Sequence, residues 1–169
     1  MMSYRAICNL LCILALIFGS GIVSGAEDLE SAGMYHDIGL DYYNQGNYSE
    51  ALVWYYKALD ICEKVLGKEH PDTAVTYNNI GEVYRNQGNY SEALVWYYKA
   101  LLIKEQVLGK EHHDTAMTYN NIGEVYWNQG NYSEALEWYE KALPIFEKVL
   151  GKDHPATTRT YNNIAKIHK

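Results

Sequence analysis

The chain has 169 residues, of which 48% are hydrophobic, so we expect one domain of ordinary size with an apolar core. It carries 14 Lys and Arg against 21 Asp and Glu, which gives a formal net charge of -7. A nucleic-acid surface needs clustered cations to neutralise phosphates, so the acidic balance excludes nucleic acid as a partner. The acids are spread along the chain, a pattern that is typical of a solvated exterior.

Residues 1–26 have the layout of a secretory signal peptide. Arg5 supplies a positive start, and residues 6–18 form an apolar run. Small residues follow, and the acids begin at Glu27. We expect cleavage after Ala26, which would make the protein secreted or periplasmic.

An N-terminal membrane anchor in residues 6–23 is the alternative. This segment is only just long enough to cross a bilayer, and Gly and Ser dilute its second half. The sequence therefore predicts contact with a membrane only if the segment is not cleaved.

The rest of the chain copies itself every 42 residues. TYNNIGEVYRNQGNYSEAL begins at Thr76 and returns as TYNNIGEVYWNQGNYSEAL at Thr118, and a more divergent copy begins at Met34. Residues 77–118 and 119–160 are identical at 31 of 42 aligned positions. Near-identity at a fixed period in this range predicts a stacked array of repeats.

Each repeat has the apolar pattern of two helices. Tyr77, Ile80 and Tyr84 fall at the spacing of one helix face, and the turn signal Asn-Gln-Gly-Asn follows. A second apolar face runs from Tyr90 to the expected helix end at Gly109. No stretch alternates with period two, so we expect an all-α fold. The predicted units are 34–72, 76–114 and 118–156, followed by a partial repeat or capping helix at 157–169.

Two local predictions come from comparing the units. Asn89 with Glu92 three residues later has the spacing of a helix-capping pair. Cys62 would be the one cysteine left after signal cleavage, so no internal disulfide is expected. Lys104 and Phe146 occupy the same position in later repeats, which favours a half-exposed free thiol at Cys62.

The repeat resembles the tetratricopeptide repeat (TPR). The consensus of aromatic, Leu, Gly, Tyr, Ala, Phe and Ala is matched in the second unit by Tyr77, Ile80, Gly81, Tyr84, Ala93, Tyr97 and Ala100. The 42-residue period and the VLGKEHPDTA connector are similar to the kinesin light chain variety. The resemblance implies a right-handed α-solenoid of three helix hairpins and a single C-terminal capping helix.

In that family the first helix of each repeat lines an inner groove. The resemblance therefore implies a peptide-binding groove at Asn78, Asn79, Glu82, Arg85, Asn86, Asn120, Asn121, Glu124, Trp127, Asn128 and Asn162. Side-chain amides can both donate to and accept from an extended peptide backbone, and Trp127 is an aromatic anchor. The alternative is that each Asn bonds a neighbouring helix, or that duplication alone copied it.

These features favour a non-enzymatic scaffold that binds a protein or an extended peptide. We expect no catalytic residues and no cofactor, because the chain has no nucleophile elbow, phosphate loop or HExxH motif. The family's clamp for a C-terminal carboxylate is not expected to work here, because of its five positions (His36, Leu40, Asn79, Met117 and Asn121) only Asn79 fits. The alternative function is a structural module that self-associates end to end.

Histidines recur in the three connectors, at His70, His112 and His154. The alternative is a metal site, above all at His112-His113. The three histidines lie one repeat apart and lack evident co-ligands, so the sequence favours structural connectors and predicts no metal site.

Three Asn-Tyr-Ser sequences match the glycosylation acceptor motif, but we favour the alternative that they are ordinary turn and cap residues of the repeat. They begin at Asn47, Asn89 and Asn131.

Overall fold

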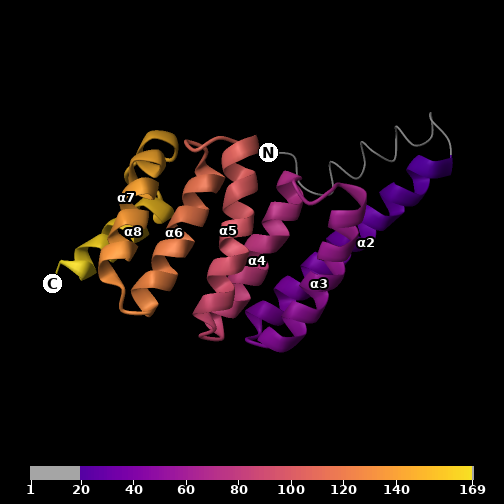
Figure 1. Cartoon of the computed structure of the whole chain (residues 1–169), viewed down its shortest axis with the longest axis horizontal. Coiled ribbons are helices and arrows are strands. Elements are labelled where there is room, and N and C mark those ends of the chain that lie inside the picture. The colour runs from indigo at the N-terminus through magenta and orange to yellow at the C-terminus, as the bar shows by residue number, and fades with distance from the viewer. Residues whose placement is uncertain (1–19, 169) are drawn as a thin grey trace. The chain divides into compact units, whose positions relative to one another are not determined.

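The computed structural model describes residues 20–168 of the chain, and in this part it contains seven helices and no strand. Successive helices are joined by short turns and connectors (Figure 1). The helices are α2 (Ser20–Asn44), α3 (Tyr48–Val65), α4 (Pro71–Asn86), α5 (Tyr90–Val107), α6 (His113–Asn128), α7 (Tyr132–Val149) and α8 (Pro155–Ile167). The predicted all-α class is confirmed, with hairpin repeats and a single C-terminal helix.

Most of the predicted signal peptide or anchor, residues 1–19, lies outside the described residues. The described chain begins within that segment at Ser20, the first residue of α2. Among the helices that the structure describes, none combines the length and apolar character needed to span a bilayer. Export and anchoring both stay predictions.

The predicted limits of the repeat units also stay predictions, because a periodic sequence can be divided into units from any starting residue. The helices give a physical register. The first helices of the second, third and last repeats begin at Pro71, His113 and Pro155, several residues before the sequence identity at Thr76 and Thr118. Leu29 and Ala32, which precede the first predicted unit, are buried, so the packed part of α2 also starts earlier than Met34.

The described chain divides into two compact units within α4, after Val83, and we describe each unit by itself. The first unit contains the α2–α3 hairpin and most of α4. In that hairpin the ring of Tyr55 lies against Gly39, where an added Cβ would be 2.8 Å from the ring. Tyr55 is buried as a result, and only glycine at position 39 allows this approach.

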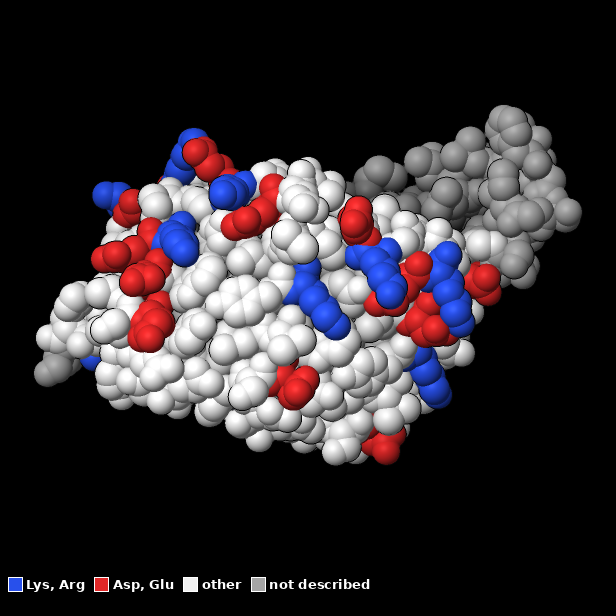
Figure 2. Space-filling view, viewed as in Figure 1, with Lys and Arg blue, Asp and Glu red and all other residues white. Residues whose placement is uncertain are grey.

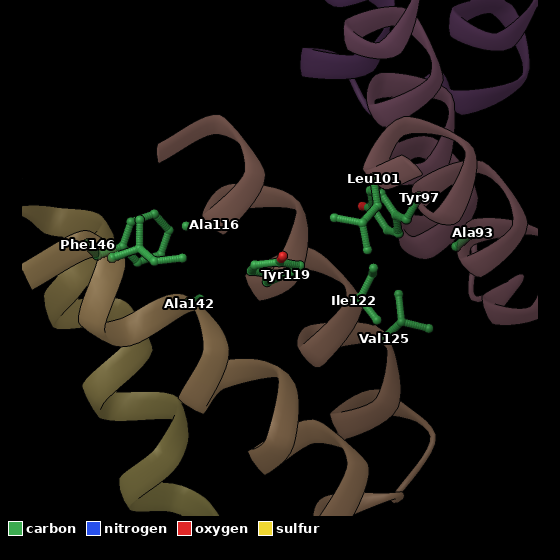
Figure 3. Close-up of a cluster of buried hydrophobic side chains, with 10 residues drawn as sticks. Ala93, Tyr97, Leu101, Ala116, Tyr119, Ile122, Val125, Ala142 and Phe146 are labelled. Atoms are coloured by element: carbon green, nitrogen blue, oxygen red, sulfur yellow. The ribbon is translucent and has the colours of Figure 1, made fainter. Parts of the chain in front are cut away.

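The second unit contains α5, α6, α7 and α8 around one apolar core. Helix α6 supplies the middle of this core through Tyr119, Ile122 and Val125, with α5 on one side and α7 on the other (Figure 3). The small residues Ala116 and Ala142 are fully buried in this core. Burial of one side chain such as Ile122 or Val125 contributes about 1.5–3 kcal/mol to the stability of the unit.

The helix ends follow the repeat. Gly109 has φ +92°, and its N–H donates to the carbonyl of Lys104, which ends α5 where the sequence predicted. The predicted capping pair at Asn89 is wrong, because its side chain makes no capping hydrogen bond. Only the equivalent Asn47 accepts such a bond, from the N–H of Glu50 at 3.5 Å. Asn47 and Asn89 have nearly the same backbone angles, and both turns make the same main-chain hydrogen bonds. We infer that these main-chain bonds, rather than the Asn side chains, stabilise the starts of α3 and α5.

The prediction that Cys62 is half-exposed is wrong. Cys62, Lys104 and Phe146 are all buried, although they differ in size and polarity. The Lys104 ammonium is accommodated by its contacts, since Nζ donates to the Thr118 hydroxyl at 3.0 Å and to the Asp114 carbonyl at 3.3 Å. Burial lowers the pKa of Lys104 to about 8, and the Asp114 carboxylate offsets this only in part.

On the face shown in Figure 2, acidic and basic side chains are interspersed rather than gathered into a field of one sign. This agrees with the solvated exterior that the sequence predicts.

Replacing Gly123 with Ala tests the hairpin contact in the second unit. Helix propensity alone would make Gly123→Ala stabilising by about 1 kcal/mol. The new Cβ, however, would lie 2.7 Å from the Tyr139 ring and 3.3 Å from the Ala135 carbonyl oxygen. We expect a net loss of about 2 kcal/mol in denaturant unfolding. The matched control is Ala165→Gly at the same position of α8, which should cost no more than about 1 kcal/mol. A Gly123→Ala variant that is more stable than the parent would contradict the contact.

Replacing Lys104 with Met tests the buried ammonium. Below pH 8 the folded protein holds a buried charge, so Lys104→Met should gain about 2 kcal/mol in stability at pH 7. Between the folded pKa of about 8 and the ordinary value of 10.5, the unfolded chain keeps the proton that the folded chain has released. The stability of the parent therefore rises with pH in this window, and its deficit against the variant narrows. Urea unfolding at pH 7 and pH 10 measures the free energy of unfolding of the parent and of the variant. A difference between the two proteins that does not change with pH would contradict the lowered pKa of Lys104.

Candidate functional site

A polar hollow lies in the second unit, where the end of α4 and the helices α6, α7 and α8 contribute side chains. Its volume is about 240 Å³. It is lined by Arg85, Asn86, Glu124, Trp127, Asn128, Tyr139, Asn163 and Lys166. Five of the predicted groove residues line it: Arg85, Asn86, Glu124, Trp127 and Asn128. Arg85 and Asn86 in α4 occupy the same positions of the repeat as Trp127 and Asn128 in α6.

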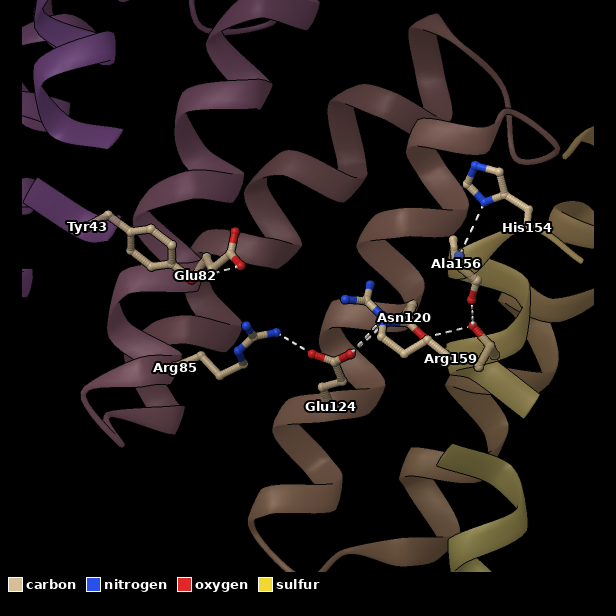
Figure 4. A network of polar contacts seen from close by, with 9 residues as sticks. Tyr43, Glu82, Arg85, Asn120, Glu124, His154, Ala156 and Arg159 are labelled. Atoms are coloured by element: carbon tan, nitrogen blue, oxygen red, sulfur yellow. Dashed lines mark hydrogen bonds and ion pairs between the residues drawn. The ribbon is translucent and has the colours of Figure 1, made fainter. Parts of the chain in front are cut away.

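Glu124 is the centre of the polar network in this hollow. Its carboxylate pairs with the guanidinium of Arg85, and the Nε of Arg159 in α8 lies 3.5 Å from its other oxygen (Figure 4). The side-chain amide of Asn120 donates to the same carboxylate at 3.0 Å. Three donors therefore hold one acid, and the surplus of the two guanidiniums makes the network cationic.

Asn120 has a structural role that the sequence left as the alternative. It is fully buried, and its Oδ1 accepts a hydrogen bond from the hydroxyl of Thr160 in α8 at 3.0 Å. Its amide group thus bonds Thr160 in α8 and Glu124 in α6, and it stabilises the packing of α8 against α6. Asn120 is thus a support beneath the hollow, and Asn121 beside it is also buried.

The last helix presents its Asn pair differently. Asn162, which the sequence placed in the groove, is exposed and does not line the hollow. Its neighbour Asn163 does line the hollow, together with Tyr139. Burial and the nearby Glu124 carboxylate raise the pKa of Tyr139, so its hydroxyl stays protonated at neutral pH.

Sequence reasoning missed four residues at or beside the hollow: Tyr139, Asn163, Lys166 and Arg159. Asn163 carried a signal, because it repeats Asn79 and Asn121. Tyr139 was assigned to packing alone, which it also performs. Lys166 and Arg159 have no counterpart of the same charge one repeat earlier, so periodicity could not find them.

Three further predicted groove residues, Asn78, Asn79 and Glu82, lie on α4 in the first unit. The hydroxyl of Tyr43 in α2 donates to Glu82 in α4 at 3.0 Å (Figure 4). The side-chain nitrogen of Asn79 lies 2.6 Å from Nε2 of His36. Burial lowers the pKa of His36, partly offset by Asp37, so the neutral imidazole can accept this bond. Asn78 is half-buried on α4.

Comparison with known families decides the identity of the array. A model described as tetratricopeptide repeat matches residues 30–106, 72–148 and 114–169. The chain belongs to the tetratricopeptide repeat family. TPR proteins commonly mediate protein–protein interaction and are typically non-catalytic scaffolds. A search of curated proteins finds no match.

Solved structures show the same fold. BtubC (BKLC) from P. vanneervenii has a TM-score of 0.74 at 24% identity, over 81% of this chain and 55% of that one. A structure from Podospora anserina, described as putative kinesin light chain nearly identical TPR-like repeats, has a TM-score of 0.72 at 23% identity, over 80% of this chain and 64% of that one. The first TPR of Spaghetti (RPAP3), bound to the HSP90 peptide SRMEEVD, has a TM-score of 0.61 at 20% identity, over 82% and 91%.

The chain thus spans between about half and two thirds of the length of the first two of these structures. The likeness to kinesin light chain-type repeats agrees with the 42-residue period, and at these identities it shows the fold alone.

Replacing Asn120 and Asn162 separately with Ala distinguishes the buried, supporting asparagine from the exposed one. Asn120→Ala should lower the free energy of unfolding by about 2 kcal/mol, because it leaves buried partners on α6 and α8 unsatisfied. Asn162→Ala removes the same group from the equivalent position of α8 and should change stability by no more than about 0.5 kcal/mol. Thermal and urea unfolding of both variants provide the measurement. Equal losses would contradict the buried role of Asn120.

Proposed function

We propose that this TPR protein is a non-enzymatic scaffold. It binds an extended segment of a partner protein at the polar hollow of its second unit. One observation carries this proposal. The hollow combines fixed polar groups with Trp127, an aromatic side chain that is 36% exposed at its edge. Large aromatic side chains left partly in water beside polar groups are frequent anchors in protein interfaces.

The chemistry of the lining suits a peptide backbone. Asn86, Asn128 and Asn163 offer amide groups that both donate and accept, so they can pair with the N–H and C=O groups of an extended chain. The Glu124 network and the buried Asn120 hold the surrounding helices, so little side-chain freedom is lost when a ligand binds. The ring centroid of Trp127 lies 6.4 Å from that of Tyr132 and 5.9 Å from the Lys166 ammonium, so these two side chains flank the indole.

The Spaghetti structure supports the proposal in a limited way, since it holds a peptide of HSP90 on this fold. The positions of the carboxylate clamp argue for a different chemistry here. His36, Leu40 and Met117 replace the basic and amide residues that the clamp needs, so we do not propose recognition of a free C-terminal carboxylate.

End-to-end self-association is the second candidate, and the exposure of Tyr161 favours it. The equivalent Tyr119 in α6 is 5% exposed because α7 covers it, whereas Tyr161 in α8 is 39% exposed. A partner copy could cover this helix face. The experiment below distinguishes the two candidates.

A displayed peptide library, screened against the full chain, tests the proposed function. We expect enriched peptides whose binding falls at least about tenfold in Trp127→Ala, because that variant removes the anchor. Leu102→Ala is the matched control, since Leu102 is an exposed apolar residue of α5 outside the hollow, and it should bind as the parent does. Enriched peptides that bind Trp127→Ala equally well would contradict the site. No enrichment, together with a mass that grows with protein concentration, would favour self-association.

A further inference from the structure

The connector between α5 and α6 places two imidazoles and a carboxylate together at the start of α6. The residues are His112, His113 and Asp114, and one ligand atom from each lies within 4.8 Å of the others. Nε2 of His113 is 3.0 Å from one oxygen of Asp114, and Nδ1 of His112 is 3.7 Å from the other. All three side chains are partly exposed to solvent, between 24% and 35%, so an ion can reach them.

The equivalent connectors do not hold this set. The first reads His70-Pro71-Asp72 and the third His154-Pro155-Ala156, so each has one imidazole where the second connector has two. Proline is favoured at the first position of a helix, because the missing N–H has no helical partner there. His113 therefore replaces the residue that suits the backbone best. A metal site at His112-His113 is the alternative that the sequence analysis set aside for want of a co-ligand, which Asp114 supplies in the structure.

We propose that His112, His113 and Asp114 form a binding site for a zinc-type divalent ion, with two imidazole nitrogens and one carboxylate oxygen as ligands. Imidazole and carboxylate are ordinary zinc ligands at about 2.0–2.2 Å, which places two ligand atoms of a tetrahedral ion about 3.4 Å apart. The separations of 3.0 and 3.7 Å lie on either side of this value, but they join the two imidazoles to different oxygens of Asp114, so the carboxylate has to turn to present one oxygen to both imidazoles. The fourth position stays open to water or to a side chain of a bound protein.

The hydrogen bond that His112 makes suits this role. Its Nδ1 accepts the N–H of Asp114 at 3.2 Å, so Nδ1 carries a lone pair and is the nitrogen that faces the carboxylate. Zinc at Nδ1 would replace this single capping bond, and the released N–H lies in the first helical turn, where water can reach it. The positive end of the α6 dipole opposes a cation here, and the Asp114 carboxylate offsets that opposition.

Titration of the full chain with zinc chloride, followed by calorimetry, tests the site. His113→Pro is the matched variant, because it converts the second connector to the His-Pro-Asp sequence of the first and keeps the capping role of His112. Asp114→Ala is a second variant that copies the Ala156 of the third connector. The remaining histidines are the same in all three proteins, so their background binding cancels.

We expect the parent to bind one more zinc ion than either variant, or to bind it at least about tenfold more tightly. Zinc should also raise the melting temperature of the parent and leave that of His113→Pro unchanged. Melting without zinc shows that each variant is folded. Identical zinc titrations of the parent and His113→Pro would overturn the site, and unchanged binding by Asp114→Ala would overturn the assignment of the carboxylate as a ligand.

Discussion

The close approach of a tyrosine ring to a glycine of the preceding helix is the constraint on which the hairpins depend. Gly39 receives Tyr55 in the first unit, and Gly123 receives Tyr139 in the second, at distances that any Cβ would violate. In the second unit this contact also positions function, because Tyr139 is both a buried packing residue and part of the hollow's lining. The repeat therefore cannot change its hairpin contact without moving the side chains of its proposed binding site.

The same repeated residue acquires different roles because its neighbours differ along the array. Asn120 is buried where α8 packs on α6, and it bonds both Thr160 and Glu124. Asn162, one repeat later, stands in the same TYNNI segment and is exposed. Cys62, Lys104 and Phe146 show the opposite case, in which three unlike side chains share one buried position. A buried position can hold Lys104 because Thr118 and Asp114 supply acceptors, at the cost of a lowered pKa.

The sequence predicted the fold well because its information is periodic. Helix faces, the turn after each first helix and the glycine ends all recur, so each is read several times. The site was predicted less completely. Burial of Asn120 depends on a helix 40 residues away, and Lys166 and Arg159 occur in one repeat only, so neither could be read from the repeat. The cap at Asn89 failed for a local reason, since main-chain bonds of the turn leave its side chain unused.

The four tryptophans allow a direct test of the central claim that ligands bind at the hollow of the second unit. Trp54, Trp96 and Trp138 lie on second helices, each beneath a lysine ammonium about 4 Å from its ring, and only Trp127 lies at the hollow. The measurement is an NMR titration of the ¹⁵N-labelled full chain with a selected peptide, with the Trp127 indole signal assigned through Trp127→Phe. The account predicts that the Trp127 indole and the side-chain amides of Asn86, Asn128 and Asn163 shift. Shifts confined to the other three indoles would contradict it.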